Sequence, residues 1–213
     1  MSNFNLERTN MSNTDWSQKY RPTKLDDMVL PSTFRQKIEK AMITRGGMSM
    51  LFYGPPGTGK TTLAEVLNAQ GLYKLNCSDT NSITDIRNLK RKCSARPLYT
   101  ERRLILLDEG DFLTKEAQAA LRGIAEEISA VNDFIMTANE PSRLSAAIHS
   151  RFLPIEFNFL ATDEYKAALK ARLKLIAELE TGTTPESALL ESIVRRQKTD
   201  IRAMIKTLQA ELP

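Results

Sequence analysis

The sequence predicts an α/β fold, in which a parallel sheet of five strands carries helices on both faces and is followed by a small helical domain. Short apolar segments alternate with segments of helical period as far as residue 159, and this alternation is typical of parallel sheets. From Thr162 onward only helical periods remain. We therefore expect a flexible N-terminal segment, an α/β domain and a helical domain over residues 1–15, 16–158 and 159–213.

Composition supports a folded chain and excludes several classes of protein. The 213 residues are 41% hydrophobic and 26% charged, which suffices for a buried core and argues against disordered or coiled-coil chains. No apolar run reaches the ~20 residues that cross a bilayer, so we expect a cytosolic chain without a membrane partner. Cys77, Cys93 and the single His149 predict neither a zinc site nor a disulfide framework, so any metal would have oxygen ligands.

The first elements precede a glycine-rich region. Residues 1–14 are polar and are left out of the expected fold. The segment 15–31 has neither a helical nor a strand period and contains two prolines, which predicts an extended chain wrapped over the surface. A helix is expected over 32–44, with Ser32 as its N-cap.

Strands and helices then alternate along the chain. Strands are expected over residues 48–53, 72–77, 103–107, 133–137 and 155–159, and helices over residues 63–71, 82–95 and 115–128. In the helical region two helices are separated by TGTTP, with Thr184 as N-cap and Pro185 as the first helical residue of the second. We place the domain boundary near Asn158.

A phosphate-binding loop is predicted between the first strand and the helix that follows it. Its sequence, GPPGTGKTT, fits the pattern G-x-x-x-x-G-K-[ST] in the strand–helix context that the pattern requires. Glycines allow backbone N–H groups to converge on phosphates, while a lysine adds a cation and a threonine hydroxyl can complete a Mg²⁺ shell. The predicted phosphate-binding residues are Gly54, Pro55, Pro56, Gly57, Thr58, Gly59, Lys60, Thr61 and Thr62.

Polar side chains follow two further strands. Asp108 and Glu109 end the strand LILL, and we expect Asp108 to hold magnesium with Thr61 while Glu109 polarises an attacking water. Asn139 ends the next strand, where it can bind that water or the γ-phosphate. Acidic residues and Asn at strand ends are otherwise common turn residues. These three residues indicate a functional site only because they occur together with the phosphate-binding loop.

The charge distribution is uneven. The net charge is only +4, but one stretch carries seven cations against the single anion Glu101. This basic block fits contacts with a DNA backbone through Arg87, Lys90 and Arg91, or a solvated helix face. Its cations are Arg87, Lys90, Arg91, Lys92, Arg96, Arg102 and Arg103.

Taken together, these residues resemble one family: the AAA+ ATPase subunits of sliding-clamp loaders, of the replication factor C and phage small-subunit type. The resemblance runs from Trp16 to Leu212 and rests on the order and spacing of several short motifs. They are WSQKYRP at 16–22, the phosphate loop preceded by LFY, NCSD at 76–79, AQAALR at 117–122, Ser150-Arg151, and Asp200-Ile201-Arg202 with Leu208-Gln209.

The resemblance implies a P-loop NTPase of AAA+ type and roles for further residues. Tyr20, Arg21 and Pro22 would line the adenine pocket, and Arg202 would sense the γ-phosphate. Arg151 would be a finger that reaches the ATP of a neighbouring subunit. Two α-helical residues, Gln118 and Arg122, would carry DNA or neighbour contacts to Glu109.

The resemblance also implies cofactors and partners. The chain would use ATP and Mg²⁺ and assemble with other AAA+ subunits into a pentamer-like oligomer. That assembly would bind primer-template DNA and load a sliding clamp in the cytoplasm of a cell or phage host, or in a eukaryotic nucleus.

Several departures from the family pattern accompany the resemblance. The family's acidic box D-E-A-D is D-E-G-D here, so Gly110 is expected to loosen the turn after Glu109. Phe152 replaces a cysteine after the finger, and Asn81 stands where an arginine is usual. The helical collar domain of loader subunits has no counterpart in these residues.

Two other classes of function compete with a clamp-loader motor. A small-molecule kinase would share the loop but would need an arginine-rich substrate lid and no Arg151 finger. An adaptor or helicase-loader-like protein would use ATP only for assembly on DNA, and an intact Glu109 argues for hydrolysis instead.

Overall fold

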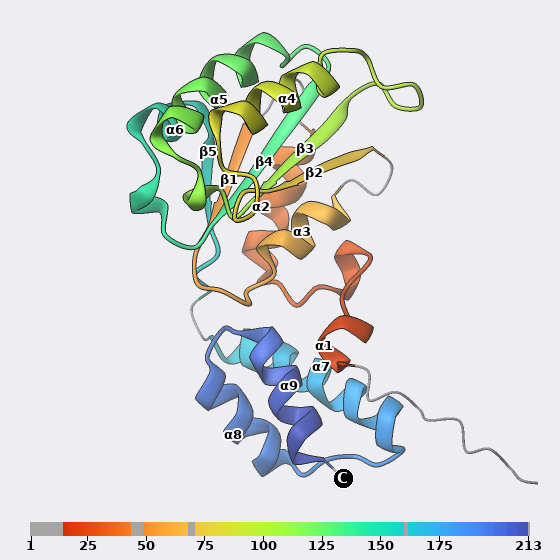
Figure 1. Ribbon diagram of the computed structural model, residues 1–213. Helices are drawn as coiled ribbons and strands as arrows, with labels where there is room; N and C mark the ends of the chain where they lie inside the picture. Colours follow the sequence, from red (N-terminus) through yellow and green to blue (C-terminus); the bar gives the residue numbers. More distant parts are fainter. Residues whose placement is uncertain (1–14, 44–48, 68–70, 160–161, 213) are drawn as a thin grey trace, which may run out of the picture.

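The computed structural model describes residues 15–43, 49–67, 71–159 and 162–212. Its centre is a parallel sheet with the strand order β2-β3-β4-β1-β5 (Figure 1). All strand pairs are parallel, as the sequence predicts. The strands are β1 (Ser49–Tyr53), β2 (Leu72–Asn76), β3 (Arg103–Asp108), β4 (Asn132–Ala138) and β5 (Leu153–Glu156).

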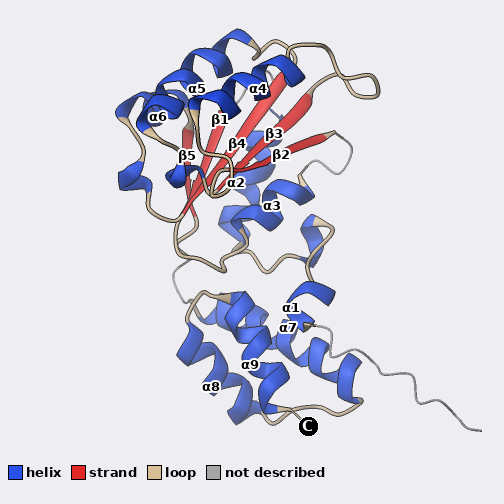
Figure 2. Cartoon of the chain, viewed as in Figure 1, coloured by secondary structure: helices blue, strands red, loops and turns tan. Residues whose placement is uncertain are grey.

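Helices cover both faces of the sheet (Figure 2). On one face α2 and α3 pack over Leu104 and Leu106, and on the other face α4, α5 and α6 pack over Ile105 and Leu107. Alternate residues of one strand thus belong to two different apolar clusters, as expected of a sheet buried on both faces. The helices are α2 (Ser32–Ile43), α3 (Lys60–Val66), α4 (Ile83–Cys93), α5 (Lys115–Glu127) and α6 (Ala146–Arg151).

The helical region contains α7 (Asp163–Thr181), α8 (Ser187–Gln197) and α9 (Ile201–Glu211), which lie at one end of the molecule (Figure 1). Phe157, Phe159 and Tyr165 are buried in an apolar cluster that continues from the sheet into these helices. The domain boundary near Asn158 therefore stays a prediction. Within the described ranges, no helix is both long and apolar enough to cross a membrane.

The segment 15–31 is not wholly extended, and that prediction was wrong in part. It forms α1 (Trp16–Lys19) and a short 3-10 helix, η1 (Leu25–Asp27). The Asp15 carboxylate caps α1 by accepting the Ser17 N–H at 2.8 Å. The backbone N–H of Trp16 donates to Gln209 of α9 at 2.9 Å, so tertiary contact stabilises a helix too short to predict.

Other boundaries differ from the sequence-based expectations. Ser32 is the first helical residue of α2 instead of its cap, and Thr44, Met48 and residues 68–70 lie outside the described residues. The last strand, β5, spans Leu153–Glu156 instead of the expected residues 155–159. The helix α8 is preceded by Glu186 at its N-cap, because the Thr184 hydroxyl donates to Glu178 instead.

Candidate functional site

The loop between β1 and α3 has the backbone shape that phosphate binding requires. Gly54, Gly57 and Gly59 have φ of 142°, 73° and 92°, which residues with a Cβ rarely adopt. At Gly54 a Cβ would lie 3.0 Å from the Phe157 carbonyl oxygen. The three glycines therefore allow a turn that ends at the N-terminus of α3, where backbone N–H groups converge.

Lys60 lies at the centre of this loop. Its ammonium donates to the carbonyl oxygens of Gly54 and Pro55 and to Oδ1 of Asn139, each at 2.8 Å. Burial lowers the pKa of Lys60 to about 8, although neighbouring carboxylates oppose the shift. The predicted pair of Lys60 and Asn139 thus meets in space, and a phosphate could replace the carbonyl acceptors of the ammonium.

Asp108 is held by hydroxyl groups from two elements. Its Oδ1 accepts from Thr61 at 2.7 Å and from Thr137 of β4 at 2.8 Å. Burial would raise the pKa of Asp108, but these hydrogen bonds and the nearby Lys74 outweigh it and lower the pKa. Thr61 and a carboxylate group are therefore adjacent, and both supply the oxygen ligands that magnesium prefers.

Lys74 of β2 contacts two carboxylates. Its Nζ lies 2.8 Å from Glu65 Oε1 and 3.1 Å from Asp108 Oδ2. Burial alone would lower the pKa of Lys74, but the bonds to Glu65 and Asp108 raise it above its ordinary value. The ammonium is therefore charged at neutral pH.

Glu109 follows Asp108 in a left-handed conformation, with φ 57° and ψ 46°. The backbone N–H of Glu109 donates to the Thr137 hydroxyl at 2.9 Å, which fixes this turn. Thr137 thus contacts Asp108 and Glu109 at once. Glu109 shares what we call the loop cleft with residues from the loop, β4 and α9: Pro56, Gly57, Gly59, Lys60, Thr61, Thr62, Thr137, Asn139 and Arg202.

Packing explains why glycine occupies position 110, where the D-E-A-D pattern has alanine. It is buried, and a Cβ there would lie 2.5 Å from Cγ of Met136. The Met136 side chain therefore fills the space that an alanine methyl group would need. Asp111 completes the turn, because its Oδ2 accepts the N–H groups of Asn139 and Glu140 at 3.2 and 2.9 Å.

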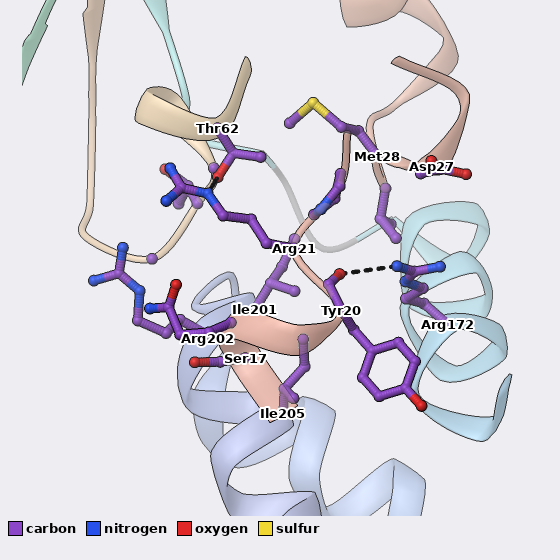
Figure 3. A pocket seen from close by; sticks show the side chains of 16 residues that line it. Ser17, Tyr20, Arg21, Asp27, Met28, Thr62, Arg172, Ile201, Arg202 and Ile205 are labelled. Atoms are coloured by element: carbon purple, nitrogen blue, oxygen red, sulfur yellow. Dashed lines mark hydrogen bonds between the residues drawn. The ribbon is translucent and has the colours of Figure 1, made fainter. Parts of the chain in front are cut away.

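A second cleft, the N-terminal cleft, adjoins the loop (Figure 3). The Arg21 Nε donates to the Thr62 hydroxyl at 3.2 Å, and its guanidinium pairs with Glu65. The Tyr20 hydroxyl donates to Glu180 of α7, so the ring lies against the helical region. Tyr20, Arg21 and Pro22, predicted to line an adenine pocket, all border this cleft with Gly57, Thr58, Gly59, Thr62 and Arg202.

The N-terminus of α9 docks directly on the loop. The Ile201 N–H donates to the Gly57 carbonyl at 3.2 Å, and Asp200 caps α9 by accepting the Ala203 N–H at 2.8 Å. A Cβ at Gly57 would lie 1.8 Å from Asp200 Oδ1. Arg202 borders both clefts from this helix end, and its role in sensing the γ-phosphate stays a prediction.

Three predicted residues on α5 and α6 border neither cleft. Arg151 ends α6, borders neither cleft, and has a buried Nε without a partner in the described part of the chain. Buried Gln118 joins the acidic turn to the segment before α6: its Nε2 donates to the Leu113 and Arg143 carbonyls at 3.1 and 3.2 Å, and its Oε1 accepts the Ser145 N–H at 2.7 Å. Arg122 is exposed on α5.

The basic block divides into structural and exposed cations. Arg102 binds Asp133 at 3.1 Å and three backbone carbonyls, so it is committed to the fold. Arg103 binds backbone and side-chain oxygens, and Lys90 pairs with Glu127 at 2.7 Å. Among the residues that the structure describes, those of the block that are exposed and have no ion-pair partner include Arg87, Arg91 and Arg96.

Sequence reasoning missed Thr137, Lys74 and Asp200 as parts of the site. Thr137 precedes Asn139 by two positions and so shares its strand face, a signal that alternation could have provided. Lys74 is a charged residue inside a strand. Asp200 stands before an apolar helix and is a typical N-cap.

The sequence of this chain was compared with those of known proteins. Residues 50–159 match the family described as ATPase family associated with various cellular activities (AAA). The replication factor C small subunit of Aeropyrum pernix is 37% identical over 92% of this chain and 62% of its own length. That of Methanothermobacter thermautotrophicus is 35% identical over 93% of this chain and 63% of its own length. The chain thus spans a little under two thirds of these curated relatives.

Solved structures of Thermotoga maritima RuvB are similar in fold. One gives a TM-score of 0.73 at 22% identity and covers 89% of this chain and 64% of that chain. Another gives the same TM-score and covers 90% and 65%. At this identity the likeness concerns the fold alone.

Proposed function

We propose, from the premise that this chain belongs to the AAA family of ATPases, that it is a clamp-loader subunit. It would bind ATP with magnesium, assemble with other AAA+ subunits, and couple ATP hydrolysis to loading a sliding clamp on primer-template DNA. The observation that carries this proposal is the convergence of Lys60, Glu109, Asn139 and Arg202 on one cleft. Identity of 37% to a replication factor C small subunit supports the choice within the family.

The residues of the two clefts fit the nucleotide and metal that the family implies. The glycine loop offers N–H groups and Lys60 to phosphates, while Thr61 and Asp108 offer oxygen atoms to magnesium. Bound magnesium would neutralise negative charge on the phosphate oxygens. Tyr20 and Arg21 border the neighbouring cleft, where the base would lie.

Hydrolysis would use groups at the carboxyl edge of the sheet. Glu109 would polarise the attacking water and Asn139, tied to Lys60, would orient it. Arg151 would act on the ATP of the next subunit, consistent with its place outside both clefts of its own chain. Gln118 would connect α6 to the acidic turn.

An exposed apolar pair supports contact with a protein partner. Leu98 and Tyr99 lie between α4 and β3 and are 90% and 94% exposed. Burying these two apolar side chains against a partner would favour association. We assign this tip to the sliding clamp.

The experiment that tests the function measures ATP turnover with and without primer-template DNA and a sliding clamp from the same source. Turnover should rise with DNA and rise further with the clamp, and the clamp-dependent part should fall in L98S/Y99S. Turnover that ignores the clamp while the chain still assembles on DNA would favour the adaptor function. No ATP turnover under any condition would refute the motor function.

DNA binding should depend on exposed cations of α4. Replacing Arg87 and Arg91 by Ala should lower DNA affinity of the ATP-assembled oligomer and reduce the slope of log affinity against log salt by about two per subunit bound. Fluorescence anisotropy at several salt concentrations measures both quantities. DNA-stimulated turnover should fall more than basal turnover.

The matched control removes the same charge elsewhere. Lys24 and Lys37 are exposed, and among the described residues neither has an ion-pair partner. Their replacement by Ala should leave the salt slope unchanged. Equal losses in the two double variants would show that only net charge matters and would remove α4 from the DNA interface.

A further inference from the structure

Lys74 occupies an unusual position beside the proposed magnesium residues. It lies in β2 at the edge of the described sheet, in register with Leu106 of β3, so alternation places it on the same face as Asp108. Its Nζ is 3.1 Å from Asp108 Oδ2. The side chain is 38% exposed, and ion pairs this exposed add little to stability, so its main effect is on the local field at Asp108.

The Asp108 carboxylate is fully engaged by the chain itself. Its Oδ1 accepts from Thr61 and Thr137, and its Oδ2 faces Lys74. A divalent cation that uses Thr61 and Asp108 must therefore enter beside an ammonium of like charge. The two cations repel each other, and a low local dielectric strengthens that repulsion.

Glu65 offers Lys74 an alternative partner. Glu65 lies on α3, and its Oε1 is 2.8 Å from Lys74 Nζ while its Oε2 is 2.6 Å from Arg21. The ammonium thus lies between two carboxylates, one at the proposed metal site and one outside it. A small movement of the ammonium away from Asp108 would release that carboxylate, and the existing contact with Glu65 would keep Lys74 paired.

We propose that Lys74 is a positioning residue that acts as an internal counter-cation of Asp108 and weakens magnesium binding, with Glu65 as the carboxylate that holds Lys74 when the metal enters. This inference rests on the proposed function, because it concerns the same nucleotide and metal site. Through Arg21, the same Glu65 also joins the metal side of the site to the N-terminal cleft.

The test measures nucleotide binding instead of turnover. A fluorescent ATP analogue is bound to the full chain, and the magnesium concentration that gives half of the metal-dependent gain in affinity is determined. In Lys74→Met this midpoint should fall on the order of tenfold, because Asp108 loses its competing cation. In Glu65→Gln it should rise, because Lys74 then has only Asp108. Lys74→Arg keeps the charge and should keep the parent midpoint.

A second lysine–glutamate pair provides the control. Lys170 is 34% exposed and lies 3.2 Å from Glu191, and neither residue borders the clefts, so Lys170→Met should not move the midpoint. An unchanged or higher midpoint in Lys74→Met, with thermal unfolding confirming a folded variant, would overturn the inference; should Lys74→Met not fold, Lys74→Gln takes its place under the same criterion. If the parent chain binds no nucleotide, the proposed function fails and the inference fails with it.

Discussion

Glu109→Gln should bind ATP about as tightly as the parent chain and turn it over at least ~10²-fold more slowly. Glutamine keeps the size of the side chain and one acceptor oxygen but cannot accept a proton from water. The backbone of this turn is fixed by the Thr137 hydroxyl rather than by the carboxylate, so the variant should keep its fold. Equilibrium binding of a labelled ATP and phosphate release under saturating ATP measure the two effects separately.

Two comparisons make this result specific. Lys60→Ala should lose ATP binding itself, because the ammonium is the charge at the centre of the loop. Glu116→Gln, which changes an exposed acid in the first turn of α5, should match the parent in both measurements. If Glu109→Gln hydrolysed ATP at the parent rate, another group would have to polarise the water.

The sheet and its phosphate loop could be predicted because their signals are local. Apolar runs located every strand, and the ends agree within one or two residues except at β5. There the apolar pattern continues through Phe157 and Phe159, which pack against the helical region after pairing has ended. The six-residue α6 was missed because fewer than two helical turns do not repeat an apolar period.

The grouping of the candidate site residues could be predicted as far as these residues lie in contiguous motifs. Lys60, Thr61, Asp108 and Asn139 meet as expected, because the carboxyl ends of parallel strands share one edge. Contacts between motifs could not be predicted in the same way. The partnership of Lys74 with Asp108 depends on strand order, which local patterns do not determine.

Tertiary contacts also give two single residues a different role from the one that the sequence suggested. Arg102 belongs to a basic run in sequence, yet it binds Asp133, which lies on a neighbouring strand. Gly110 suggested a loose turn, yet Met136 packs where a Cβ would be. In both cases the deciding partner lies far along the chain, so composition and spacing give no signal for it.

Mixed oligomers should reveal a site shared between subunits. Arg151→Ala should leave ATP binding by the isolated chain intact, because Arg151 borders neither cleft. It should suppress hydrolysis in the assembly by roughly 10³-fold, since a finger in trans stabilises charge in the transition state. Lys60→Ala should be inactive for the different reason that it binds no ATP. Each variant alone therefore lacks activity, but each retains what the other has lost.

Combining the two variants should restore activity at interfaces where the Lys60 of an Arg151→Ala chain meets the Arg151 of a Lys60→Ala chain. Random head-to-tail assembly at equal ratio makes about a quarter of the interfaces competent, so turnover should peak near that ratio. The matched control mixes Lys60→Ala with Glu109→Gln, whose altered residues share one cleft. Every chain of that mixture carries a damaged cleft, so none of its interfaces combines an intact cleft with an arginine finger. Mixed oligomers of the first pair that stay as inactive as the control would exclude Arg151 as a finger in trans.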